Sequence, residues 1–193
     1  MKTVFFDIDT QIDFLFPAGA LYAPGAEKII GTVARLNHHA AKHGIPVVST
    51  MDAHSENDPE FQAWPHHCVV DTLGRQKPAS TLLEKRVIVP NAPCALHLAD
   101  AHQVLLEKQT FSALSNMNFP QLLNHFAADR YVVYGVVTEV CVKFAAFGLL
   151  ETGKRVEIVT DAVRALSDEA GARTLADFTA MGGHLTQAGM IYA

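Results

Sequence analysis

Short apolar segments alternate along this chain with longer segments in which apolar residues recur at helical spacing. The short segments, rich in Val, Ile and Phe, predict strands at residues 3–8, 45–50, 86–88, 103–107, 131–136, 155–160 and 184–186. The longer segments predict helices at residues 26–43, 119–128, 139–151 and 168–181. This alternation predicts an α/β fold with three α-β-α layers around a mostly parallel, doubly wound sheet.

A polar stretch at about residues 51–80 interrupts the alternation. It is too long for a simple connection between two elements, so we expect it to carry function. The chain shows no internal repeat, low-complexity segment or linker composition. Residues 1–193 are therefore predicted to form a single domain with this stretch as an excursion.

Reactive side chains follow four of the predicted strands. Asp9 follows the first strand and Asp52 with His54 follows the second, whereas Lys108 and Cys141 come after two later strands. Parallel sheets bind ligands at the carboxyl ends of their strands. Because four strand exits deliver such groups to one edge, an active site there is favoured over coincidence.

Cys141 is the candidate nucleophile, since it lies one turn inside a predicted helix that starts directly after a strand. The positive end of the helix dipole favours a thiolate, although a buried structural cysteine is the alternative. The Asp9 carboxylate could take the thiol proton and later give it to a leaving amine, and the Lys108 ammonium could stabilise both groups. Taken alone, Asp9 could be a capping or turn residue and Lys108 a surface charge. A single catalytic site explains Asp9, Lys108 and Cys141 together.

A metal site is the second candidate constellation. Asp52 and His54 lie two residues apart past a strand end, and His67 follows in the segment Trp64-Pro65-His66-His67-Cys68. Two imidazoles and one carboxylate suit Zn²⁺ or another first-row divalent ion. The chain has ten histidines, so a scattered pair is the alternative reading. Cys68 is either a fourth ligand or a packed core residue.

Composition narrows the function class. The net charge is -5 without a Lys/Arg-rich run, which gives no electrostatic reason to expect nucleic acid or an anionic membrane as partner. No apolar run approaches the roughly 20 residues of a membrane span, and the start does not resemble a signal peptide. Three cysteines argue against a disulfide framework. We therefore expect a cytoplasmic protein.

Three motifs, in order, resemble those of the isochorismatase-like cysteine hydrolases. They are Asp9-Thr10-Gln11-Ile12-Asp13-Phe14, Lys108-Gln109-Thr110-Phe111-Ser112-Ala113 and Gly135-Val136-Val137-Thr138-Glu139-Val140-Cys141-Val142. The resemblance covers nearly the whole chain. It implies that Asp9, Lys108 and Cys141 are catalytic. It also implies a cis peptide bond between Val136 and Val137, with the N–H groups of Val137 and Cys141 forming an oxyanion hole.

Within that family the chain resembles the nicotinamidases, through Asp52-x-His54 and Trp64-Pro65-x-His67-Cys68. The resemblance implies a divalent metal held by Asp52, His54 and His67, with zinc expected first and iron or manganese as alternatives. It also implies a substrate pocket whose lining residues are Phe14, Trp64 and Val136. Core packing is the alternative role of Phe14 and Trp64.

Two residues depart from the nicotinamidase pattern. Glu60 stands where some members carry a third metal-binding histidine; direct ligation, ligation through water and no role all stay open. Asp71 stands where glycine is usual, which could reshape its loop and change the substrate.

The implied reaction is the metal-dependent hydrolysis of nicotinamide to nicotinate and ammonia. Another small amide or carbamoyl substrate, or a non-catalytic ligand- or metal-binding role on the same scaffold, stays open. A vinyl-ether hydrolase is less favoured, because such members generally lack the nucleophilic cysteine. The expected partner is a small amide, and a homo-oligomer is left open.

Overall fold

The computed structural model describes residues 1–193 and contains one seven-stranded sheet in the order β3-β4-β2-β1-β5-β6-β7. Every neighbouring pair of strands is parallel. The strands are β1 (Thr3–Ile8), β2 (Val47–Asp52), β3 (Arg86–Val89), β4 (Gln103–Lys108), β5 (Arg130–Val136), β6 (Arg155–Arg164) and β7 (His184–Thr186). The predicted α/β class with a parallel sheet is confirmed.

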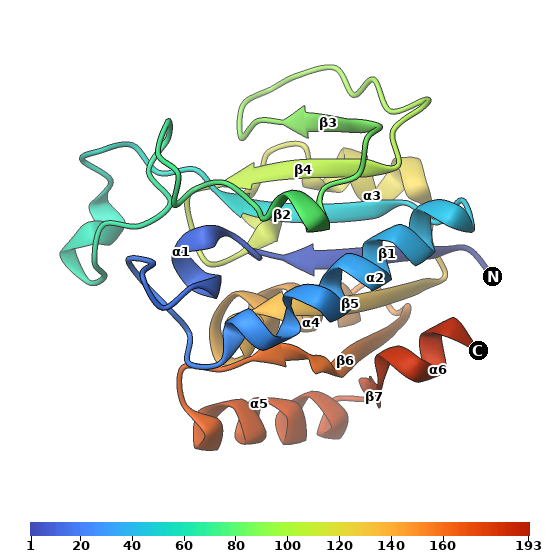
Figure 1. Cartoon of the computed structure of the whole chain (residues 1–193). Coiled ribbons are helices and arrows are strands. Elements are labelled where there is room, and N and C mark those ends of the chain that lie inside the picture. The colour runs from blue at the N-terminus through green and yellow to red at the C-terminus, as the bar shows by residue number, and fades with distance from the viewer.

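Helices cover both faces of the sheet (Figure 1). They are α1 (Ile12–Leu15), α2 (Ile30–Lys42), α3 (Phe119–Phe126), α4 (Lys143–Leu150), α5 (Asp168–Ala180) and α6 (Ala188–Tyr192). Figure 1 shows α2 crossing in front of the sheet, with α3 and α4 behind it. No helix in the structure is both long enough and apolar enough to cross a membrane.

Strand β1 lies between two hydrophobic cores. Phe5 belongs to the core under α2 and α6, whereas Phe6 belongs to the core under α3, α4 and α5. Because successive side chains of a strand point to opposite faces, two adjacent phenylalanines serve both cores. Burying each one stabilises the fold by about 1.5–3 kcal/mol. This central, doubly covered strand is a rigid support for the residue that follows it, Asp9.

Several element ends differ from the sequence prediction. The second strand starts at Val47 because the Ile45 N–H donates to the Ala40 carbonyl and so belongs to the end of α2. It continues to Asp52, which pairs in register with Lys108 of β4. Both candidate site residues are therefore the last residues of their strands. Pairing with a neighbouring strand determines where each strand ends. The hydrophobic pattern of one segment does not indicate this pairing.

Two predicted helices change geometry along their length. The helix predicted at residues 26–43 opens with a 3₁₀ turn, η1 (Ala26–Ile29), before α2. The helix predicted at residues 139–151 opens with a π-helical turn, η5 (Thr138–Val142), which carries Cys141. Such π turns are frequent at functional sites.

The polar excursion lies between β2 and β3 at the carboxyl ends of the strands, the left side of Figure 1. It contains two short 3₁₀ turns, η2 (Pro59–Gln62) and η3 (Ala79–Thr81). A third such turn, η4 (Ala113–Ser115), follows β4 at the same edge. The excursion and the exits of β1, β2, β4 and β5 therefore share this edge.

Candidate active site

Asp9 follows β1 directly, is fully buried and has a left-handed backbone with φ 46°. Its Oδ1 atom accepts a hydrogen bond from the Thr50 hydroxyl at 2.6 Å. Its Oδ2 atom lies 2.8 Å from the Lys108 Nζ atom. The carboxylate is thus held between a hydroxyl and an ammonium.

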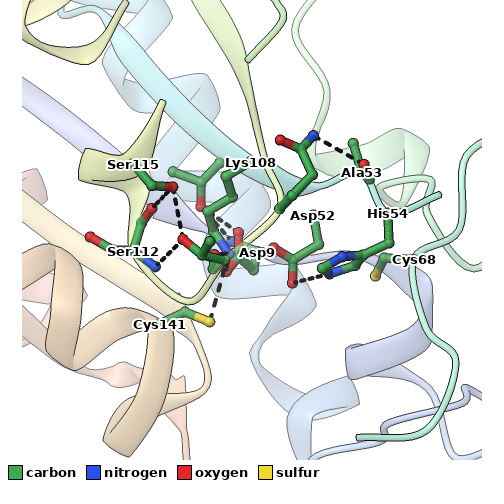
Figure 2. A network of polar contacts seen from close by, with 12 residues as sticks. Asp9, Asp52, Ala53, His54, Cys68, Lys108, Ser112, Ser115 and Cys141 are labelled. Carbon is green, nitrogen blue, oxygen red and sulfur yellow. Dashed lines mark hydrogen bonds and ion pairs between the residues drawn. The ribbon is translucent and has the colours of Figure 1, made fainter. Parts of the chain in front are cut away.

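Lys108 is completely buried at the end of β4. Its Nζ atom contacts Asp9, the Asp52 carboxylate and the Thr110 carbonyl, and lies 3.8 Å from the Cys141 sulfur. Burial lowers the pKa of Lys108, but the Asp52 and Asp9 carboxylates raise it by more, so its pKa is well above the ordinary value. Lys108 is therefore a permanent cation at the centre of the site (Figure 2).

Cys141 faces this cluster from the π turn η5 (Figure 2). Burial raises the pKa of its thiol well above the ordinary value, because the effect of Lys108, which lowers it, is outweighed. The Asp9 and Asp52 carboxylates raise it further. A fully buried thiol loses the water that would solvate its anion, so burial opposes the thiolate that the helix end favours. The thiol needs a base, and the Asp9 carboxylate offers an oxygen within 4.8 Å of the sulfur.

The predicted cis peptide bond between Val136 and Val137 is present. The Val137 N–H donates to no backbone carbonyl. Val137 and Cys141 both line the cavity described below. A free N–H at this position can serve an oxyanion, which keeps both residues as candidates for that role.

The candidate metal ligands converge at the end of β2. The Oδ2 atom of Asp52 lies 3.9 Å from the Nε2 atom of His54 and 3.8 Å from that of His67. All three residues are buried, and each offers a ligand atom within 4.8 Å of the others. His67 uses Nδ1 for the Pro65 carbonyl at 2.7 Å, while His54 Nε2 has no hydrogen-bond partner. Orphaned imidazole nitrogens facing a carboxylate fit a divalent ion.

Glu60 lies at the same cluster. Its Oε1 atom is 4.0 Å from His54 Nε2 and 3.7 Å from His67 Nε2. Burial raises the pKa of Glu60, and burial also raises the pKa of Asp52 to about 7. A cation among these acids and imidazoles would offset the cost of their desolvation. Cys68 is buried against the Gly74 carbonyl and is not part of this cluster.

A narrow cavity joins the two constellations. Asp52, Glu60 and His67 of the metal cluster line it, and so do Cys141 and Val137. The remaining lining residues are Phe14, Leu21, Trp64, Phe111, Val140 and Leu166. The cavity suits a small molecule with an apolar, flat body and a polar end.

The predicted pocket residues Phe14 and Trp64 line this cavity, but Val136 does not. Val136 is fully buried in the core beneath α2. It is the last residue of β5, whereas Val137, which follows it across the cis peptide bond, lines the cavity.

A comparison with protein families shows which family has this fold. The family model described as the Isochorismatase domain matches residues 3–189. The chain belongs to the isochorismatase family.

Two curated relatives in this family are nicotinamidases. That of Escherichia coli (strain K12) is 24% identical over 184 residues, covering 83% of this chain and 82% of the relative. That of Saccharomyces cerevisiae (strain ATCC 204508 / S288c) is 26% identical over 204 residues, covering 88% and 90%. Among solved structures, the zinc complex of pyrazinamidase from Pyrococcus horikoshii superposes with a TM-score of 0.82 at 27% identity, covering 97% of this chain and 99% of that one.

Asp71, the second departure from the nicotinamidase pattern, lies outside the candidate site. Asp71 has φ 66°, the left-handed conformation that a glycine adopts without strain. Its side chain is exposed and does not line the cavity. The aspartate therefore keeps the backbone shape of a glycine at this turn.

Three functional candidates were missed in the sequence. Thr50 binds Asp9, Phe111 lines the cavity, and Asp58 lies 3.1 Å from His54 Nδ1. Phe111 was within reach of sequence reasoning, since it lies in the lysine motif. Thr50 and Asp58 give no local signal, because their contacts depend on how segments pack.

Proposed function

We propose that this isochorismatase-family protein is a metal-dependent nicotinamidase, which hydrolyses the carboxamide of nicotinamide to nicotinate and ammonia. One observation carries the proposal: the Asp9, Lys108 and Cys141 cluster and the Asp52, His54 and His67 cluster meet at one narrow, aromatic-walled cavity. Its aromatic and polar walls suit a planar ring with a carboxamide. The curated nicotinamidases that resemble the chain support the same substrate.

In this mechanism Asp9 takes the proton of the Cys141 thiol, and the thiolate attacks the carboxamide carbon. The N–H groups of Val137 and Cys141 stabilise the oxyanion that forms. When the C–N bond breaks, Asp9 returns the proton to the nitrogen, which leaves as ammonia. Asp9 next deprotonates a water, which attacks the thioester, and nicotinate leaves as Cys141 recovers its thiol.

Lys108 keeps the site electrically balanced through both halves of the reaction. It lies within contact of Asp9 and 3.8 Å from the Cys141 sulfur. When the proton moves from sulfur to Asp9, negative charge moves from the carboxylate to the thiolate. A fixed cation beside both groups stabilises each state without reorganisation.

Asp52, His54 and His67 would hold the metal, with Glu60 as a fourth ligand within reach. Zinc is supported by the donor set and by the zinc complex of the Pyrococcus horikoshii relative. When bound, the metal supplies a Lewis acid that can take the lone pair of a ring nitrogen or of an ordered water. Phe14, Trp64 and Phe111 hold the flat ring by contact.

A cytoplasmic location is supported by the three unpaired cysteines.

Ammonia release from nicotinamide by the purified protein tests the proposal, with and without chelator and beside Cys141→Ala. We expect turnover in the metal-loaded protein and its loss in both other samples. Losing a nucleophile that acts with its base costs roughly 10⁴-fold or more in kcat. Turnover that survives in Cys141→Ala would refute the nucleophile. Metal-loaded protein that releases no ammonia from nicotinamide would move the substrate to another amide.

A further inference from the structure

A threonine that does not line the site cavity holds the candidate base. Thr50 is fully buried in β2, two residues before Asp52, and does not line the site cavity. Its hydroxyl donates to Asp9 Oδ1 at 2.6 Å and accepts from the Asp9 N–H at 3.0 Å. One hydroxyl therefore fixes both the backbone and the side chain of Asp9.

These bonds make the two oxygens of Asp9 unequal. Oδ1 has a hydrogen-bond donor, whereas Oδ2 is buried without a well-aligned donor and has only the Lys108 ammonium 2.8 Å away. Asp9, Asp52 and Cys141 each offer an atom within 4.8 Å of the other two. Because Oδ1 already accepts the Thr50 hydroxyl proton and no aligned donor occupies Oδ2, Oδ2 is the oxygen with a lone pair left for the thiol proton.

A second buried ion pair, between Lys77 and Asp7, holds the residues that neighbour Asp9. Lys77, near the end of the excursion, donates to the Thr10 hydroxyl at 2.8 Å and lies 3.3 Å from Asp7. Thr10 in turn donates to Asp7 at 2.6 Å. Lys77 also donates to the Thr50 backbone carbonyl at 3.5 Å. The neighbours of Asp9 in the chain and in the sheet are thus tied to one fully buried network.

We propose that Thr50 is a positioning residue, which occupies Asp9 Oδ1 and so assigns proton transfer with Cys141 to Oδ2. This inference rests on the proposed function, because it needs Asp9 as the base. Without the Thr50 hydroxyl, the Asp9 carboxylate can rotate about its Cα–Cβ and Cβ–Cγ bonds and pair with Lys108 through either oxygen. Fewer molecules then hold a free oxygen against the thiol, while the cavity that binds substrate is unchanged.

Thr50→Val removes the hydroxyl and keeps the shape. Turnover of nicotinamide by Thr50→Val should show kcat lowered roughly 10- to 100-fold by misplacement of the base, with KM within about 2-fold because ground-state binding is untouched. Thr50→Ser restores the hydroxyl, so its kcat should lie within about 3-fold of wild type. An unchanged kcat in Thr50→Val, a KM that rises with the fall in kcat, or a serine variant as slow as valine would overturn the proposal.

Thr174→Val is the matched control, because Thr174 is a buried threonine of α5 without a side-chain hydrogen bond. It should match wild type in turnover, and melting temperatures should be recorded for all variants. If Thr50→Val does not fold at the assay temperature, Thr50→Ala, which leaves room for a water at the Asp9 N–H, is assayed with the same expectation.

Alkylation of Cys141 by iodoacetamide, followed on its own peptide by mass spectrometry, tests Thr50 without any substrate. The rate should fall roughly 5-fold or more in Thr50→Val and recover in Thr50→Ser, since alkylation needs the thiol proton to leave. Equal rates in all three proteins would overturn the role of Thr50. Wild-type protein that releases no ammonia would instead refute nicotinamide as substrate, and the alkylation rates would still decide on Thr50.

Discussion

Asp52 serves two groups at once, because its two carboxylate oxygens face different neighbours. Oδ1 contacts the Lys108 ammonium, and Oδ2 faces the Nε2 atoms of His54 and His67. The candidate catalytic cluster, through Lys108, and the candidate metal cluster are therefore linked by one side chain. This link depends on the pairing of β2 with β4, which the order of residues does not indicate.

Asp58 is expected to orient His54 toward the metal. Its Oδ2 atom lies 3.1 Å from His54 Nδ1, and its Oδ1 atom accepts the Glu60 N–H at 2.9 Å. Because a carboxylate on Nδ1 leaves Nε2 free as a ligand, Asp58→Asn should weaken zinc binding by roughly 10- to 100-fold. Competition with a chromophoric chelator measures this affinity. Asp100→Asn, at an exposed site near β4, is the control and should bind zinc as wild type does.

The ends of adjacent strands bring the site together. Asp52 of β2 and Lys108 of β4 are partners in register, so the pairing of these strands alone sets them side by side. The π turn η5 at the end of β5 then turns Cys141 toward them. A one-residue slip in the pairing of β2 with β4 would point Asp52 or Lys108 to the opposite face of the sheet.

At the other end of the sheet, β5 and β6 carry a charge cluster that should make stability depend on pH. Glu157 accepts hydrogen bonds from Arg130 at 2.9 and 2.6 Å and from Arg155 at 2.5 Å. Burial raises the pKa of Glu157, but these two arginines lower it by more, so its pKa lies below the ordinary 4.5. Folding therefore favours the ionised form.

The lowered pKa sets the sign of the pH dependence. Ionised Glu157 stabilises the folded protein at pH values above the pKa that this residue has in the unfolded chain, and this stabilisation is lost as the pH falls through its pKa in the folded protein. Glu157→Gln should lower the free energy of unfolding by roughly 1 kcal/mol at pH 7 and by less at pH 3. Urea unfolding at both pH values measures this. Glu169→Gln, in the exposed pair with Arg173, should change neither value. A loss that is equal at both pH values would contradict the assignment.

For the molecule as a whole, the metal cluster is expected to fasten the excursion to the sheet. His67 lies within the excursion and Asp52 at the end of β2, so an ion held by both would bridge the two. Asp13 of α1 makes a second link, since it accepts the Cys68 N–H at 2.7 Å. Gly74 packs so closely there that a Cβ would lie 2.1 Å from Asp13 Oδ2.

Zinc should therefore raise the melting temperature, and chelation should lower it. At a free concentration 100 times its Kd, a ligand stabilises the folded state by about 2.7 kcal/mol, or roughly 5–10 °C for a chain of this size. Differential scanning fluorimetry with zinc and with chelator measures the shift. His67→Ala should abolish it, whereas His66→Ala, at the exposed neighbouring histidine, should retain it. A shift that persists in His67→Ala would show that zinc binds elsewhere.

The local order of residues was enough to predict the α/β fold, the strand that precedes each reactive group, and the motifs around Asp9, Lys108 and Cys141. Hydrophobic periodicity and strand exits are properties of neighbouring residues, so they can be read along the chain. Three features could not be predicted in this way. They are the raised pKa of Cys141, the contact of Asp52 with both Lys108 and the metal cluster, and the hydrogen bond from Thr50 to Asp9. Desolvation and hydrogen bonds between residues 41 to 56 positions apart depend on strand register and burial, which exist only once the chain has packed.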